Sequence, residues 1–152
     1  MNTMVQLGTN FRVRRLDPDE CLARAVELMQ WAKPAFEHAA GEVNEVEAVR
    51  LCAMDEATAF VGEDNGKLSA LLIAQIIHFP LKKVCLVLAY SGRACDFYAA
   101  NAWLEAWAAQ KGCCEMRGYG QEGPMRLARK HGYSEIYRVY VKPLKRSTDD
   151  VH

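Results

Sequence analysis

Residues 84–119 read VCLVLAYSGRACDFYAANAWLEAWAAQKGCCEMRGY. The run 84–90 is apolar, with β-branched and aromatic residues, and it predicts a strand; a further strand is predicted over 113–119. Between them, residues 97–111 have helical periodicity and are followed by Gly112, which is typical of a helix end. The apolar stripe of this helix consists of Ala100, Trp103, Leu104 and Trp107. Two strands joined by one helix are expected to lie parallel in one sheet.

The sequence just upstream predicts a meander of three antiparallel strands, of which 84–90 is the last. Residues 58–62 form a short candidate strand, and 68–79 form a longer run rich in leucine and isoleucine. They are joined by Glu-Asp-Asn-Gly at 63–66, a turn of the Asn-Gly type that favours hairpins. Because 68–79 is strongly apolar, we expect it to be the central strand, buried on both faces.

A first strand and two helices are predicted before the meander. Apolar and charged residues alternate at the start of 11–16, as in a strand with one buried face. Asp17, followed by proline and then by Glu20, is typical of a capped helix start. Asn44 and Glu47 repeat this spacing and predict a second helix.

The last part of the chain predicts a short helix over 122–130, a final strand over 133–141 and a polar tail over 145–152. The order of elements is therefore β-α-α-β-β-β-α-β-α-β. This order indicates an α/β (α+β) fold, in which a mixed, mostly antiparallel sheet is flanked by helices. We expect one domain, spanning 1–144.

Acidic and basic residues balance, with 19 Lys and Arg against 19 Asp and Glu. The chain therefore lacks the basic excess typical of a dedicated nucleic-acid-binding protein, and no nucleic-acid partner is expected. No run approaches the ~18 consecutive apolar residues of a membrane-spanning helix, so no membrane partner is expected either.

Six cysteines are scattered through the chain without a C-x-x-C pair, so no metal site is predicted. The first ten residues lack the apolar core of a secretory signal. Cysteines within periodic segments, here Cys21, Cys52, Cys85 and Cys95, usually behave as small core residues. We therefore expect six free thiols and a cytoplasmic protein.

Two segments of the C-terminal third resemble helices of GNAT (Gcn5-related) N-acetyltransferases. Residues 103–113, WLEAWAAQKGC, look like the third helix of this family, and 125–133, MRLARKHGY, look like its fourth helix and Gly-Phe/Tyr exit. The order of elements over 11–144 is also that of the family. The sequence as a whole further resembles those of small GNAT-like proteins encoded by bacteriophages. The resemblance implies a V-shaped opening between the fourth and fifth strands, here 84–90 and 113–119, in which acetyl-CoA lies.

In this family the fourth strand binds the pantetheine arm, and the start of the next helix binds the pyrophosphate, because unpaired N–H groups there attract anions. The resemblance therefore implies a cofactor-binding segment made of Leu88, Ala89, Tyr90, Gly92, Arg93, Ala94, Cys95 and Asp96. Cys95 and Phe97 replace the loop glycines of the family. Asp96 is expected to cap the helix, where it would compete with an anion. Arg93 is either a phosphate ligand or a solvated turn residue.

Many family members place a tyrosine in the fourth helix to protonate the leaving thiolate, and that position is Ala128 here. Tyr119, Tyr133 and Tyr137 are candidate substitutes; the alternative is that each is a partly buried sheet tyrosine. Glu115, in the strand 113–119, is a candidate general base, with a solvated surface charge as the alternative.

Three functions remain open. The first, implied by the resemblance, is acetyl-CoA-dependent acetyl transfer to an amine of a small molecule or a protein. The second is a catalytically inactive GNAT-fold binding or assembly protein that has lost acetyl-CoA, for example a bacteriophage component in the virion, with a homo-oligomer or another assembly partner. The third is modification of a nucleobase, which needs a basic groove that the balanced charge disfavours. Arg93 and the retained helices favour the first; the replaced glycines and Ala128 favour the second.

Overall fold

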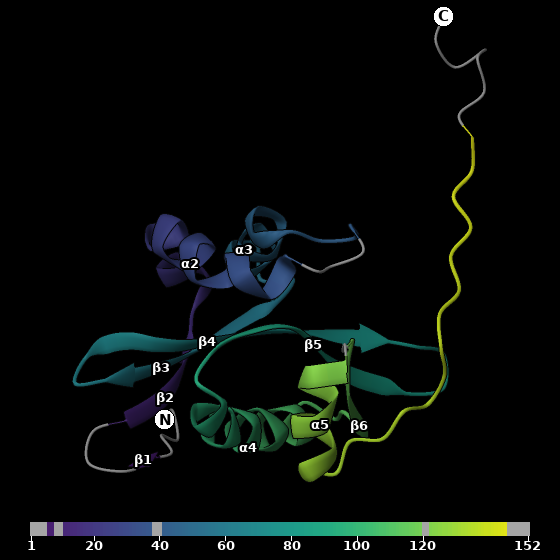
Figure 1. Ribbon diagram of the computed structural model, residues 1–152. Coiled ribbons are helices and arrows are strands. Elements are labelled where there is room, and N and C mark those ends of the chain that lie inside the picture. Colours follow the sequence, from purple (N-terminus) through teal and green to yellow (C-terminus); the bar gives the residue numbers. More distant parts are fainter. Residues whose placement is uncertain (1–5, 8–10, 38–40, 120–121, 146–152) are drawn as a thin grey trace, which may run out of the picture. The chain divides into compact units, whose positions relative to one another are not determined.

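The computed structural model describes residues 6–7, 11–37, 41–119 and 122–145 (Figure 1). The chain divides into two units, residues 1–119 and residues 120–152. The strands of the first unit are β1 (Gln6–Leu7), β2 (Phe11–Leu16), β3 (Thr58–Asp64), β4 (Lys67–His78), β5 (Lys83–Gly92) and β6 (Glu115–Gly118). Its helices are α1 (Pro18–Ala23), α2 (Ala25–Ala32), the 3-10 helix η1 (Lys33–Phe36), α3 (Glu45–Ala53) and α4 (Ala94–Gln110).

The strands form one sheet in the order β1-β2-β3-β4-β5-β6. Neighbouring strands from β1 to β5 are antiparallel. In contrast, β5 and β6 are parallel, with Val84 opposite Glu115 and Val87 opposite Gly118. The predicted mixed, mostly antiparallel sheet and its parallel pair are therefore confirmed.

The meander follows the local signals of the sequence. Asn65 and Gly66 have φ angles of 53° and 79°, the left-handed conformation that a two-residue hairpin turn requires. The central strand β4 is buried on both faces, because Leu71 and Leu72 point into different core clusters. Both expectations for this region are confirmed.

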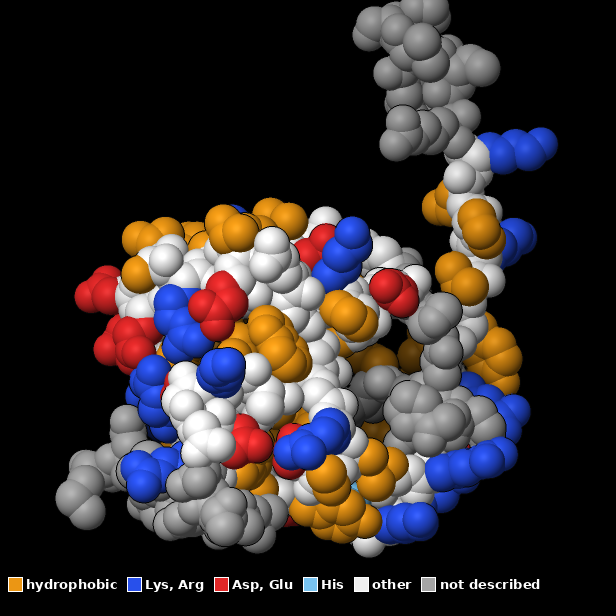
Figure 2. All heavy atoms as spheres, turned by 60° about the vertical axis from the view of Figure 1, so that its left-hand side comes forward, with side chains coloured by type: hydrophobic (Ala, Val, Ile, Leu, Met, Phe, Trp, Pro, Cys, Tyr) orange, Lys and Arg blue, Asp and Glu red, His pale blue; other side chains and the backbone are white. Residues whose placement is uncertain are grey.

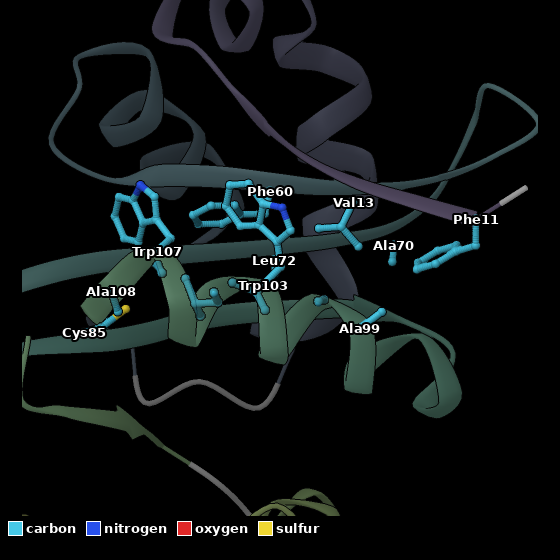
Figure 3. Packing of buried hydrophobic residues seen from close by; sticks show 13 residues of the cluster. Phe11, Val13, Phe60, Ala70, Leu72, Cys85, Ala99, Trp103, Trp107 and Ala108 are labelled. Carbon is cyan, nitrogen blue, oxygen red and sulfur yellow. The ribbon is translucent and has the colours of Figure 1, made fainter. Parts of the chain in front are cut away.

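Helices cover both faces of the sheet (Figure 1). On one face, Trp103 and Trp107 of α4 pack edge to face on Phe60, with ring centroids 4.9 and 5.2 Å away (Figure 3). On the other face, α1, α2, η1 and α3 pack around buried residues such as Leu28 and Cys52. Figure 2 shows apolar side chains exposed on top of this second layer. The large exposed residues of these helices and their ends are Leu22, Val26, Val46 and Met54.

The two predicted helix starts are confirmed. The Asp17 carboxylate accepts a hydrogen bond from the Glu20 N–H at 2.9 Å, and the Asn44 side chain accepts one from the Glu47 N–H at 2.9 Å. The helix predicted after Asp17 is interrupted at Arg24, whose φ of −105° and ψ of 18° end α1 and begin α2. No residue of helix-breaking type marks this interruption in the sequence.

The second unit contains α5 (Glu122–Lys130), which lies where the sequence predicts it. The strand predicted over 133–141 is wrong, because the described residues 133–145 contain no strand. A strand requires a neighbour that completes its ladder of backbone hydrogen bonds, and the described part of this unit offers none. Val139, Tyr140 and Val141 are accordingly 75%, 90% and 87% exposed.

The boundary between the units falls inside the single domain predicted over 1–144, and that assignment stays a prediction. Of the predicted tail over 145–152, only Lys145 lies among the described residues. Within the described ranges, no helix is long and apolar enough to cross a membrane, and no cluster of three metal-ligating side chains occurs. All six cysteines are free thiols in the structure.

Candidate functional site

The parallel strands β5 and β6 separate after four paired residues. The last pair joins Val87 to Gly118, and β5 then continues to Gly92 while bonded on its other side to β4. Leu88 is an extra residue at this point, because Ala89 lies opposite Ile73 and Val87 lies opposite the next residue of β4. Such a bulge bends a strand and increases its twist. Residues 88–92 therefore present an edge that no described strand covers, and we call this segment the open edge.

Gly92 allows β5 to turn into α4. Its φ is 149°, and a side chain there would place Cβ 2.9 Å from both the Ala70 Cβ and the Tyr90 hydroxyl. Only glycine adopts this conformation and tolerates so close an approach. The open edge and the first turn of α4 are therefore consecutive in the chain.

The start of α4 differs from the sequence prediction. The helix begins at Ala94 rather than at residue 97, and its N-cap is Arg93, which makes no side-chain capping bond. Asp96, predicted to be the cap, is the third residue of the helix. The prediction was wrong because the Asp96 carboxylate bonds a guanidinium instead of the backbone. The N–H groups of Ala94 and Cys95, at the first two positions of the helix, have no acceptor within it.

Arg93 and Asp96 form a two-bond ion pair across this first turn. Arg93 Nε lies 3.0 Å from Asp96 Oδ2, and Nη2 lies 3.3 Å from Oδ1. The Arg93 side chain is 64% exposed and the Asp96 side chain 8%. The carboxylate occupies two of the five N–H donors of the guanidinium, so the exposed remainder can still bind an anion.

Tyr90 ties the end of the open edge to the helix start. Its hydroxyl donates a hydrogen bond of 2.5 Å to the Arg93 carbonyl, and its ring packs edge to face on Phe97 with centroids 5.1 Å apart. Burial, followed by the nearby Asp96 carboxylate, raises the pKa of Tyr90. We conclude that Tyr90 stays protonated and fixes the backbone on which Arg93 sits.

Cys95 was predicted to be a core residue, and this is wrong because its side chain is exposed. The shift of the helix start explains the error: Cys95 is the second residue of α4, outside the stripe that packs on the sheet. Its sulfur lies 3.8 Å from Asp96 Oδ1. The residues of the predicted binding segment thus lie on the open edge and in the first turn of α4, and their role in binding stays a prediction.

Glu115 lies apart from this stretch. It pairs with Val84 at the first position of the parallel ladder, whereas the strands separate after the last. Its carboxylate contacts Lys82 at 2.9 Å and Arg117 at 2.8 Å. Hydrogen bonds from Lys82, which has the larger effect, and from Arg117 lower the pKa of Glu115. A carboxylate with a lowered pKa is a weaker base, so this geometry does not favour the predicted role.

The tyrosines that are candidates to protonate the leaving thiolate lie in different parts of the chain. Tyr119 directly follows β6, on the side where the strands separate, and it is 80% exposed. Tyr133 belongs to the second unit, where its N–H donates to the Ala128 carbonyl at 3.1 Å.

Two features of the site were not predicted from the sequence: the bulge at Leu88 and the hydrogen bond from the Tyr90 hydroxyl to the Arg93 carbonyl. Neither feature has a local sequence signal.

Solved acetyltransferase structures share this fold. Similar ones include an aminoglycoside acetyltransferase from an uncultured soil metagenomic sample, in complex with trehalose, at a TM-score of 0.69 and 13% identity over 92% of this chain and 100% of that one. AAC(6')-Iy in complex with the bisubstrate analogue CoA-S-monomethyl-acetylneamine matches at a TM-score of 0.67 and 13% identity, over 91% and 100% of the two chains. Ribosomal-protein-alanine N-acetyltransferase from Brucella melitensis biovar Abortus 2308 matches at 0.62 and 13%, over 89% and 99%.

No protein-family model matches the chain, and no curated protein matches its sequence. The structural neighbours are GNAT acetyltransferases, so the chain has the GNAT fold. A fold hosts many activities, and the activity has to be argued from the chemistry of the site.

Proposed function

We propose that this chain is an acetyl-CoA-dependent acetyltransferase, which binds acetyl-CoA along the open edge and transfers the acetyl group to an amine. One observation supports this most: β5 leaves β6 after Val87 and leads through Gly92 directly into the first turn of α4. A free strand edge offers hydrogen bonds to an amide-rich arm, and a helix N-terminus attracts a diphosphate. Coenzyme A carries both groups on one chain.

The residues of this stretch would divide the binding between them. The backbone of Leu88, Ala89 and Tyr90 faces the pantetheine amides from the open edge. The first-turn N–H groups of Ala94 and Cys95 receive the diphosphate, and the exposed Arg93 guanidinium adds a charge-assisted bond. The replaced loop glycines of the family are compensated in part by Gly92, which lets the backbone turn closely past Ala70.

Acetyl-CoA supplies a thioester whose carbonyl carbon is attacked by the amine, so that a C–N bond forms and the C–S bond breaks. Backbone N–H groups of the open edge would stabilise the oxyanion of this reaction. The departing thiolate takes up a proton, and Tyr119 is our first candidate donor because it follows the end of β6 at which the strands separate. Tyr133 is the alternative. Glu115, held in its ion pairs, is the less favoured candidate base.

The amine belongs to a small molecule or to a protein. Structural neighbours cover both kinds by name, since they include aminoglycoside acetyltransferases and a ribosomal-protein-alanine N-acetyltransferase. An aminoglycoside and a peptide with N-terminal alanine are therefore the first amines to test.

The experiment is a thermal unfolding series of the full chain with acetyl-CoA, followed by mass spectrometry of both amines after incubation. A ligand that binds only the folded state adds about 2.7 kcal/mol of stability at a hundredfold excess over its dissociation constant. We expect the melting temperature to rise with acetyl-CoA and the mass of one amine to increase by one acetyl group. An unchanged melting temperature at millimolar acetyl-CoA would contradict the proposal.

A second candidate is a GNAT-fold binding or assembly protein without activity. It is supported by the Arg93–Asp96 pair, because the buried Asp96 carboxylate binds the guanidinium that would otherwise bind a phosphate. Ala128 in place of the expected tyrosine supports it as well. Absence of acetyl-CoA binding would favour this second function.

A further inference from the structure

A cavity of about 310 Å³ lies at the other end of α4 from the open edge. The residues of its wall that matter here are Arg15, Asp55, Glu56, Ile76, Trp107 and Lys111. We call it the Arg15 cavity. Trp107 and Lys111 belong to the last turn of α4 and the residue after it, whereas Ala94 begins the helix. A helix of this length spans roughly 25 Å, so the Arg15 cavity is separate from the proposed acetyl-CoA site.

The charged groups of the Arg15 cavity are not satisfied by one another. Arg15 Nη2 lies 4.0 Å from Asp55 Oδ1, which is beyond hydrogen-bond distance. Arg15 Nε is buried and has no hydrogen-bond partner within the part of the chain that the structure describes. A buried donor without an acceptor destabilises a protein unless something else supplies one. The Arg15 side chain as a whole is 34% exposed, so its guanidinium can still donate hydrogen bonds to a carboxylate.

Asp55 faces the guanidinium from the turn between α3 and β3. Its φ of 61° places it in the left-handed region, which aspartate tolerates better than most residues. Its side chain is 69% exposed at the rim, and Glu56 is the next residue of the wall. Opposite charges thus meet at one cavity without pairing closely.

The rest of the wall is mixed: Ala57, Ile76 and Trp107 are apolar, whereas Thr58, His78 and Lys111 are polar. Trp107 packs on Phe60 in the core (Figure 3), and Lys111 Nζ lies 5.9 Å from the centroid of its indole ring. Ile76 of β4 packs against the same core cluster. The cavity therefore combines a guanidinium, two carboxylates and the apolar side chains of Ile76 and Trp107 in a volume at the lower end for small-molecule sites.

We propose that the Arg15 cavity binds a small zwitterion of the α-amino-acid type. Arg15 takes the carboxylate, Asp55 takes the ammonium group, and Ile76 and Trp107 contact the apolar side chain. A simple anion fits less well, because two carboxylates line the wall and the nearby C-terminal end of α4 carries partial negative charge. A simple cation fits less well because Arg15 and Lys111 repel it.

The test is a calorimetric titration of the full chain, without acetyl-CoA, with L-leucine and L-phenylalanine at up to about 10 mM. Leucinamide, which lacks the carboxylate, and N-acetyl-leucine, which lacks the ammonium group, are the matched ligands. We expect at least one of the two amino acids to bind, and both derivatives of leucine to bind at least tenfold more weakly than leucine.

Two variants test whether the amino acid binds in the Arg15 cavity. Arg15→Gln and Asp55→Asn should each weaken it at least tenfold, whereas Arg12→Gln, which changes an exposed arginine of the same strand, should leave it unchanged. Asparagine tolerates the left-handed conformation, so Asp55→Asn keeps the test decisive even where Arg15→Gln fails to fold. No binding of either amino acid, equal binding of the leucine derivatives, or wild-type binding by Asp55→Asn would overturn the proposal.

Discussion

Arg93 and Asp96 hold each other at the first turn of α4, and this pair decides how well the site can bind a phosphate. The carboxylate is nearly buried, so it cannot leave the turn, whereas the guanidinium is mostly exposed and can change partner. Phosphate and Asp96 therefore compete for the same cation and for the same positive end of the helix.

This competition predicts opposite effects for two substitutions. Arg93→Ala removes a charge-assisted bond to phosphate, so the dissociation constant for acetyl-CoA should rise severalfold. Asp96→Asn removes the competing charge and should tighten binding severalfold. Calorimetry on both variants checks this, with Arg12→Ala as the control for loss of an exposed arginine. Equal affinities of Arg93→Ala and wild type for acetyl-CoA would show that Arg93 does not contribute to binding.

Gly92 gives a second prediction at the scale of single residues. Gly92→Ala forces a Cβ to within 2.9 Å of Ala70 Cβ at a φ of 149°, and strain of this kind costs roughly 1–3 kcal/mol. Gly118→Ala is the matched control, because a Cβ at Gly118 meets nothing within 4 Å. We expect urea denaturation to show Gly92→Ala as the less stable variant by at least about 1 kcal/mol. Equal midpoints would show that the close approach is relieved without cost.

At the scale of elements, the success of sequence reasoning depended on how local each signal is. The caps Asp17 and Asn44 and the Asn65-Gly66 turn are set by residues within one turn of chain, and all three were predicted correctly. The start of α4 was misplaced because the Asp96 carboxylate has two possible partners, the backbone and Arg93. The bulge at Leu88 was not predicted, because a bulge depends on the register against a neighbouring strand.

The attachment of β6 to the sheet predicts a pH dependence. Glu115 joins Lys82, just before β5, to Arg117 within β6, and these cations lower the pKa of its carboxyl. A group with a lowered pKa stabilises the fold above its unfolded value, and this contribution is lost as the pH falls through the folded value. Glu115→Gln should therefore be less stable than wild type at about pH 7, and by a smaller margin at about pH 3.

Urea midpoints at the two pH values measure this effect, with Glu37→Gln as a control for loss of an exposed carboxylate. A difference between Glu115→Gln and wild type that persists unchanged at the lower pH would show that the ion pairs are not its cause.

At the scale of the whole molecule, the order of elements was enough to predict the mixed sheet and its parallel pair, because a strand, helix, strand succession leaves few arrangements. The final strand over 133–141 was predicted wrongly, because a segment forms a strand only where a neighbouring strand completes its hydrogen bonds. The candidate site followed from the family resemblance and from the end of β5. Its chemistry stays a prediction, and Glu115, the predicted base, lies at the end of the β5–β6 ladder away from the binding segment.

The central claim is that the open edge and the first turn of α4 bind acetyl-CoA, and hydrogen–deuterium exchange with and without acetyl-CoA tests it most directly. Bound ligand should slow exchange of the backbone N–H groups at residues 88–96, because they acquire acceptors and lose contact with water. Residues 58–64 of β3, which lie two strands away from this edge, should exchange at the same rate in both samples. Slower exchange confined to 88–96 is the predicted result. Unchanged exchange there at saturating acetyl-CoA, or protection confined to other segments, would contradict the account.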